Sequence, residues 1–68
     1  MLRMSFGIAY KITENTEVED FYIANKFYNV TEGEIVSLID DDGDIAVVQL
    51  FSGEEVLIES ELVVEVTN

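Results

Sequence analysis

The sequence predicts a mainly β protein of one domain, built on a rolled antiparallel sheet of four to five strands. Three observations support this prediction. Apolar residues alternate with polar ones in short runs, as in strands with one buried face. Glycines stand beside Asp or Ser between these runs, where tight turns are expected. A chain of 68 residues is long enough for only one small domain with a thin core.

The first expected strand spans residues 6–12, where large apolar side chains recur at every second position. The segment 13–16 follows it and consists of turn-forming and capping residues, so the strand is expected to end there. The alternating residues of this strand are Phe6, Ile8, Tyr10 and Ile12.

The segment 17–30 has two interpretations. Thr16 and Glu19 have the spacing of a capping box, which favours a short helix near residues 18–24 that gives way to extended chain around Phe27. The aromatic content and an alternation through the same residues favour a strand instead. We expect the helix, and the strand remains the alternative.

Further strands are expected at residues 34–39, 45–51, 56–58 and 62–66. Asp42-Gly43 lies between the first two of these and has the chemistry of a hairpin turn. Residues 52–54 and 59–61 are expected to form the next two turns. In the strand 45–51 the alternation predicts that Ala46, Val48 and Leu50 share one face and that Ile45, Val47, Gln49 and Phe51 share the other.

The stretch from Lys26 to Val66 resembles an SH3-like barrel. The resemblance is carried by residues 32–36 as the entering strand, by the Asp42-Gly43 hairpin, by the hairpin at 52–56, and by 60–64 as the last turn and strand. It implies a small barrel that closes on itself and so protects its edges. Because such barrels host many kinds of binding, the resemblance implies no particular ligand.

The composition argues against enzymatic chemistry. The chain has no His and no Cys, so it can form neither a disulfide nor a thiolate–histidine metal site, and no hydroxyl has a histidine to activate it. We therefore expect no catalytic residue, no cofactor and no metal. The segment Asp40–Asp44 resembles a calcium loop, but with Gly43 at the sixth position Leu38 would be first and Gln49 twelfth. A solvated hairpin tip explains it, and a divalent-ion sensor is the third hypothesis for function.

The charge is the most unusual property of the chain. Fifteen carboxylates oppose three cations, which gives a formal net charge of −12, beyond the roughly 2–8 charges typical of a small domain. A chain of this length should be roughly 28 Å across. Duplex DNA carries roughly 16 phosphates over that distance. Three cations are too few for a basic footprint, so we do not expect direct binding of nucleic acid.

In size and charge the chain resembles phage-encoded acidic inhibitors that imitate DNA. The resemblance implies a non-enzymatic module that inhibits or modulates a basic, nucleic-acid-binding protein. In this hypothesis carboxylates attract the partner and two aromatic side chains are buried against it. The residues expected to bind the partner are Glu14, Glu17, Glu19, Asp20, Tyr22, Asp40, Asp41, Asp42, Asp44 and Phe51.

The alternative is a structural or assembly module that forms a homodimer or docks on a larger complex, with acidity serving solubility. The aromatic residues bear on this choice, because Tyr10, Tyr22, Tyr28 and Phe51 either fill the core or form an exposed platform. No apolar run is long enough for a signal peptide or a membrane span, so we expect a cytoplasmic protein, in the host cytoplasm if it is viral.

Overall fold

The computed structural model describes residues 9–66, and these residues form a mainly β structure. Seven strands and one short 3-10 turn account for the regular structure in this range. The elements are β1 (Ala9–Ile12), β2 (Thr16–Asp20), β3 (Phe27–Val30), β4 (Ile35–Asp41), β5 (Ile45–Gln49), β6 (Glu55–Glu59), η1 (Ser60–Leu62) and β7 (Val63–Val66). The predicted fold class is therefore confirmed at the level of an antiparallel sheet, although it has more strands than expected.

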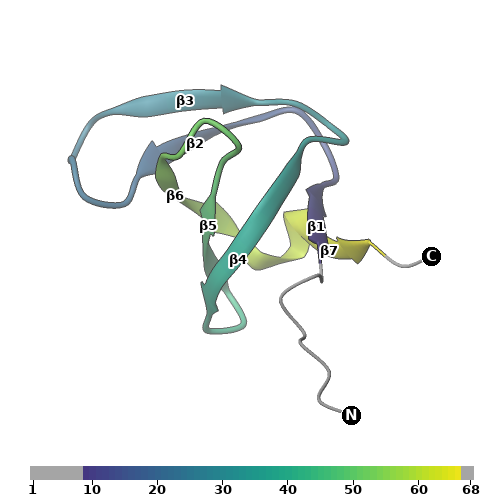
Figure 1. The fold of residues 1–68 in the computed structure, drawn as a ribbon. Helices are drawn as coiled ribbons and strands as arrows, with labels where there is room; N and C mark the ends of the chain where they lie inside the picture. Colours follow the sequence, from purple (N-terminus) through teal and green to yellow (C-terminus); the bar gives the residue numbers. More distant parts are fainter. Residues whose placement is uncertain (1–8, 67–68) are drawn as a thin grey trace, which may run out of the picture.

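All seven strands belong to a single antiparallel sheet in the order β3-β2-β6-β5-β4-β1-β7 (Figure 1). The expected closure into an SH3-like barrel is wrong, because among residues 9–66 β3 pairs only with β2 and β7 pairs only with β1. The two ends of the sheet do not meet. Within the described residues, β3 and β7 are thus the edge strands.

The core lies on one face of this sheet. Every strand from β1 to β6 contributes a buried side chain to one cluster, and partly buried residues of β7 and η1 pack against it. A flat sheet could not bury one face without a second layer, so this sheet bends around its own inner side (Figure 1). The buried cluster consists of Ile12, Val18, Val30, Val36, Ala46, Val48, Leu50, Val56 and Ile58.

The helix expected near residues 18–24 is wrong. Residues 16–20 form β2, and residues 21–26 form the turn into β3. The sheet prevails over the local capping signal because Val18 joins the core and β2 pairs on both sides, with β3 and with β6. Glu19 accepts a hydrogen bond from the backbone N–H of Asn25, 2.9 Å away, and so serves the turn instead of a helix terminus.

The predicted turns after β4 and β5 are confirmed. Gly43 and Gly53 have φ angles of 98° and 108°, which residues with a side chain rarely adopt. The β4–β5 pairing also contains a bulge: Leu38 pairs with Val48, and Asp40 pairs with Val47. Ile39 therefore has no partner on β5, and the strand is expected to bend there.

The first predicted strand is confirmed over residues 9–12, and its remaining residues, 6–8, lie outside the described range. The turn expected at 59–61 is a 3-10 turn one residue further along, and β7 follows it directly. Within the described residues there is no helix long and apolar enough to cross a membrane.

The position of the core predicts a contrast between two isoleucines in strands. Ile12 is fully buried, whereas Ile35 is 51% exposed. Ile12→Ala should lower the free energy of unfolding by about 3 kcal/mol, because it removes apolar contacts and leaves a cavity. Ile35→Ala should cost less than about 1 kcal/mol. Urea denaturation of both variants measures the difference, and equal losses would contradict the assigned core.

Candidate functional site

The outer face of the sheet carries both acidic and apolar side chains on neighbouring strands. One row runs across five strands and is fixed by the pairing register. Its members, from β3 to β4, are Phe27, Glu19, Leu57, Val47 and Asp40. Carboxylates thus lie beside apolar side chains on this face. The apolar side chains offer a ligand a surface to bury, and the carboxylates create a negative potential.

An open groove of about 520 Å³ lies on this outer face. The apolar residues that line it include Phe27, Ile45 and Leu57 of three different strands, together with Val18, Ile58 and Leu62. The carboxylates that line it come from the β1–β2 turn, from β2 and from the end of β6. They are Glu14, Glu17, Glu19 and Glu59.

A second hollow, of about 350 Å³, continues the first one toward the β4–β5 hairpin. The two share Ile45 and Glu59, and the second adds Asp44 and Glu61. We call the combined feature the acidic groove and define it by its six carboxylates. These are Glu14, Glu17, Glu19, Asp44, Glu59 and Glu61.

Among the described residues, those that line the acidic groove carry charges of one sign only. Neither of the cations in the described residues, Lys11 and Lys26, lines it. The Lys26 ammonium instead lies over the ring of Tyr28, 5.7 Å from its centroid. Six carboxylates without a neighbouring cation create a negative potential that attracts a cationic ligand.

Asp20 is not available as a surface ligand, although the sequence hypothesis included it. It pairs with Val56 on the inner side of the sheet and is buried. Its carboxylate accepts hydrogen bonds from the Tyr28 hydroxyl at 2.7 Å and from the backbone N–H groups of Tyr22 and Ile23 at 2.8 Å. The hydrogen bond from Tyr28 and those from the backbone lower the Asp20 pKa. Asp20 therefore holds the turn between β2 and β3.

The hairpin tip uses three of its aspartates to hold its own backbone. Asp41 accepts hydrogen bonds from the Ser60 hydroxyl and the Gly43 N–H, and these lower its pKa. Asp42 accepts from the N–H groups of Ile45 and Asp44, with the same effect on its pKa. Asp40 likewise accepts from the Asp41 N–H. Only Asp44 of the tip reaches the acidic groove.

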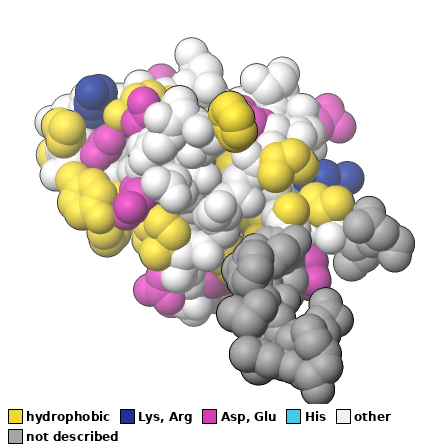
Figure 2. Space-filling model, in the orientation of Figure 1, with side chains coloured by type: hydrophobic (Ala, Val, Ile, Leu, Met, Phe, Trp, Pro, Cys, Tyr) yellow, Lys and Arg dark blue, Asp and Glu magenta, His cyan; other side chains and the backbone are white. Residues whose placement is uncertain are grey.

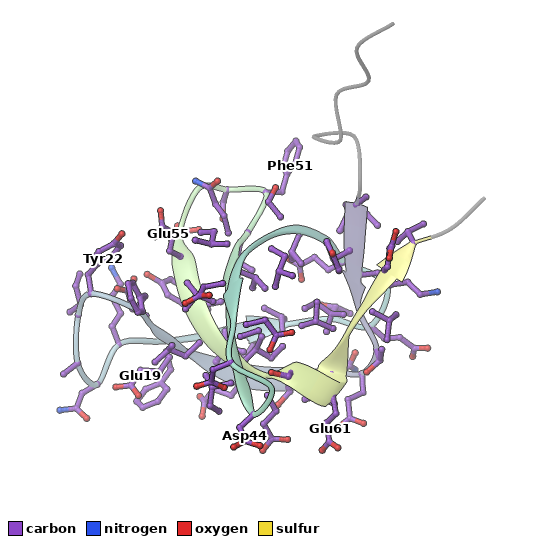
Figure 3. The ribbon with its side chains drawn as sticks, turned by 90° about the horizontal axis from the view of Figure 1, so that it is seen from below. Glu19, Tyr22, Asp44, Phe51, Glu55 and Glu61 are labelled. Carbon is purple, nitrogen blue, oxygen red and sulfur yellow. The ribbon has the colours of Figure 1, made fainter. Side chains whose placement is uncertain are left out.

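The two aromatic residues proposed for partner binding lie away from the acidic groove. Phe51 is 97% exposed in the β5–β6 turn, and Figure 3 shows it on the opposite side of the molecule from Asp44 and Glu61. Tyr22 is 72% exposed, and its hydroxyl donates to Glu55 at 2.7 Å, which raises the Tyr22 pKa. Tyr22 also packs edge-on against Phe21.

The aromatic residues divide between the core and the surface. Tyr10 and Tyr28 are partly buried against the core cluster, whereas Tyr22 and Phe51 are exposed. The exposed ones do not form one platform. Tyr22 extends from the β2–β3 turn, where Figure 2 also shows apolar side chains gathered at the left of the view, and Phe51 extends from another turn.

Four of the ten predicted partner-binding residues meet in the acidic groove, namely Glu14, Glu17, Glu19 and Asp44. The prediction missed the carboxylates Glu59 and Glu61 and the apolar floor. The alternation in 45–51 already placed Ile45 on the face opposite Ala46, Val48 and Leu50, so that part of the signal was present. The neighbours of Ile45 depend on the strand order, which the sequence pattern did not provide.

The described residues contain no group of three or more His, Cys, Asp and Glu side chains placed to hold a metal ion. Comparisons of the chain with models of protein families, with curated proteins and with solved structures give no significant match. Functional inference therefore rests on the groove and its surroundings.

The Asp20–Tyr28 hydrogen bond predicts a pH-dependent stability difference between the wild type and Tyr28→Phe. The bond raises the Tyr28 pKa from 10.0 to about 12. Its contribution is therefore complete below pH 10 and is lost as the pH rises toward 12. Because Asp20 has a lowered pKa, the contribution is also lost as the pH falls below the ordinary value of 3.8.

Urea denaturation across this pH range measures the difference. The wild type should exceed Tyr28→Phe in stability by a constant margin in the neutral range, and the margin should narrow at both extremes. A margin that stays unchanged from neutral pH to pH 12 would contradict the role of this hydrogen bond.

Proposed function

We propose that the protein is a non-enzymatic binding module whose acidic groove holds a basic segment of a protein partner. The observation that carries the proposal is the groove itself, where six carboxylates and no described cation surround an apolar floor. Arginine and lysine side chains match this surface, because they combine an apolar stem with a charged head. The groove volume is also within the range of roughly 300–1,000 Å³ found for binding sites.

Four carboxylates outside the acidic groove have lowered pKa values. Asp20, Asp41, Asp42 and Glu54 each accept hydrogen bonds that lower the pKa, which keeps the carboxylate charged. A general acid near neutral pH needs a pKa shifted upward. These carboxylates are thus suited to presenting negative charge and stabilising turns.

We further propose that the partner is a nucleic-acid-binding protein and that the module inhibits or modulates it, as a DNA mimic would. All fifteen carboxylates lie in the described residues. A rigid sheet that carries this charge can compete with phosphates for the same basic surface, and it would also accelerate association at low salt. A cytoplasmic location, in a host cell if the protein is viral, is consistent with such a partner.

An assembly module is the alternative, and it is favoured by the exposed apolar side chains of the β2–β3 turn. Phe21, Tyr22 and Ile23 are consecutive and all exposed. Docking on a larger complex would bury them. Under this alternative, neutralising carboxylates of the acidic groove should leave association unchanged.

Charge neutralisation in the groove tests the proposal. Glu17→Gln combined with Glu59→Gln should weaken binding of a fluorescent decaarginine peptide about tenfold at low salt, because two groove charges are removed. Glu32→Gln combined with Glu65→Gln removes the same charge outside the groove and should have a much smaller effect. Fluorescence anisotropy measures both affinities. Equal losses in the two double variants would indicate attraction to the overall charge and contradict a defined groove.

Competition with DNA tests the proposed partner class. Proteins captured from a bacterial lysate at low salt should be released by a salt gradient and by an excess of duplex DNA, because both act on the same basic surface. The Glu17→Gln/Glu59→Gln variant should capture less of them, and the Glu32→Gln/Glu65→Gln variant serves as the matched control. Captured proteins that resist duplex DNA would count against mimicry of nucleic acid.

A further inference from the structure

We propose that the basic segment binds as an added β-strand along the free edge of β3, with its cationic side chains on the outer face of the sheet. This inference rests on the proposed function and adds to it the conformation of the ligand and the edge that receives it. β3 is the terminal strand of the sheet and pairs only with β2 in the described structure. A strand edge of this kind can receive a peptide by main-chain hydrogen bonding.

The pairing register shows which backbone groups are free. The Asp20 N–H donates to the Lys26 carbonyl at 2.7 Å, so this residue pair is hydrogen-bonded. Antiparallel ladders alternate hydrogen-bonded and non-hydrogen-bonded pairs, which directs the backbone of Tyr28 toward β2. The N–H and C=O groups of Phe27 and Asn29 then point to the free edge. Two successive docking positions are therefore available to an added strand.

The β3 edge is short, but it lacks two devices that usually prevent strand addition, namely charged side chains and proline. No charged residue and no proline occurs in residues 27–31, although 26% of the chain is charged. Natural edges are commonly protected by charge, proline or bulges. The other edge, β7, carries Glu65 between two valines. The two edges thus differ, and β3 is the one open to pairing.

The side chains next to this edge match a cationic strand. Phe27 and Asn29 share the outer face with Glu19 and Glu17, their partners on β2. Because adjacent strands lie about 4.8 Å apart, the carboxylates are about 10 Å from an added strand. An arginine opposite Phe27 would lie across that half-exposed ring and direct its guanidinium toward Glu19. An arginine opposite Asn29 would point toward Glu17 over a smaller side chain.

The negative charge of this chain favours a strand from another protein over a second copy as the occupant of the β3 edge. Antiparallel pairing of two β3 edges would bring Glu17 and Glu19 of both copies onto one surface, and each chain already carries a net charge of −12. Like charges at this spacing disfavour that dimer. A basic segment with a cationic residue at every second position turns the same carboxylates into favourable contacts. We therefore assign the edge to such a segment.

Strand addition can be tested with a short synthetic peptide of alternating arginine and threonine. The control peptides have the same sequence and charge but carry N-methyl groups on alternate backbone nitrogens, one peptide on its arginines and the other on its threonines. Only alternate N–H groups of an added strand face the β3 edge, so one control should bind at least about tenfold more weakly than the unmodified peptide, and the other should retain most of the affinity. Equal affinities of all three peptides would overturn the proposal.

Asn29→Pro tests the edge from the protein side. The substitution removes an N–H that points away from β2, and proline is tolerated at such edge positions. It should weaken binding of the unmodified peptide about as much as N-methylation does, whereas Asn29→Ala keeps the N–H and should retain most of the affinity. Circular dichroism and thermal unfolding establish that both variants remain folded. Unchanged binding to a folded Asn29→Pro variant would overturn the proposal.

Amide hydrogen exchange on the unsubstituted protein tests the proposal without relying on the Asn29→Pro variant. Adding the peptide should slow exchange at Phe27 and Asn29, while Tyr28, whose backbone faces β2, should change little. Protection that appears without peptide and grows with protein concentration would assign the edge to a second copy and overturn the proposal.

The two proposals can fail separately. If Glu17→Gln/Glu59→Gln weakens peptide binding but N-methylation does not, the acidic groove binds cations without strand addition. If N-methylation and Asn29→Pro weaken binding while neutralisation does not, strand addition stands and the electrostatic role of the groove fails. If neither has an effect, both proposals are wrong.

Discussion

A single sheet that must bury its own inner face is the constraint on which the rest of this structure depends. The described residues provide no second layer, so the sheet has to bend until its strands cover one another. The core consists largely of valine and isoleucine, whose branched side chains fill a narrow space without long reach. Because this core is thin, the loss of one large side chain removes a substantial part of the stability.

The same constraint determines where the charge lies. Apolar side chains fill the buried inner positions, so the carboxylates lie on the outer face, in the turns and at exposed strand ends. Asp20 is the one buried carboxylate among the described residues, and three hydrogen-bond donors satisfy it. The acidic groove forms where outward positions of β2, β5 and β6 adjoin the 3-10 turn. The alternation of apolar and polar residues along the strands thus determines both the core and the positions of the carboxylates.

Local chemistry made much of the fold predictable. The glycine turns, the division of 45–51 into two faces and the mainly β class follow from alternation and from turn residues close in sequence. The short helix was wrong because the capping signal at Thr16 and Glu19 is local, whereas β2 gains pairing on both sides. Barrel closure was wrong because the meeting of two edges depends on the curvature of the whole sheet.

The candidate site was predictable only in part, for a related reason. Acidic residues near one another in sequence, such as Glu17 and Glu19, were recognised as candidates. The contributions of Ile45, Leu57 and Glu59 depend on which strands become neighbours, and β6 lies between β2 and β5 although it follows both in the chain. Asp20 and Asp41 also accept hydrogen bonds within the protein, which takes Asp20 out of the candidate site and engages Asp41. Neither composition nor spacing indicates these hydrogen-bond partners.

The bulge at Ile39 has a consequence for how the curvature of this sheet is encoded. Leu38 and Asp40 pair with consecutive residues of β5, so Ile39 is one residue more than the ladder requires. A chain without it would retain every residue pair between β4 and β5, and each of those side chains would keep its face. Only the local bend would be lost. Adding or removing one residue of β4 can therefore change the curvature of the sheet without changing which residues form its core.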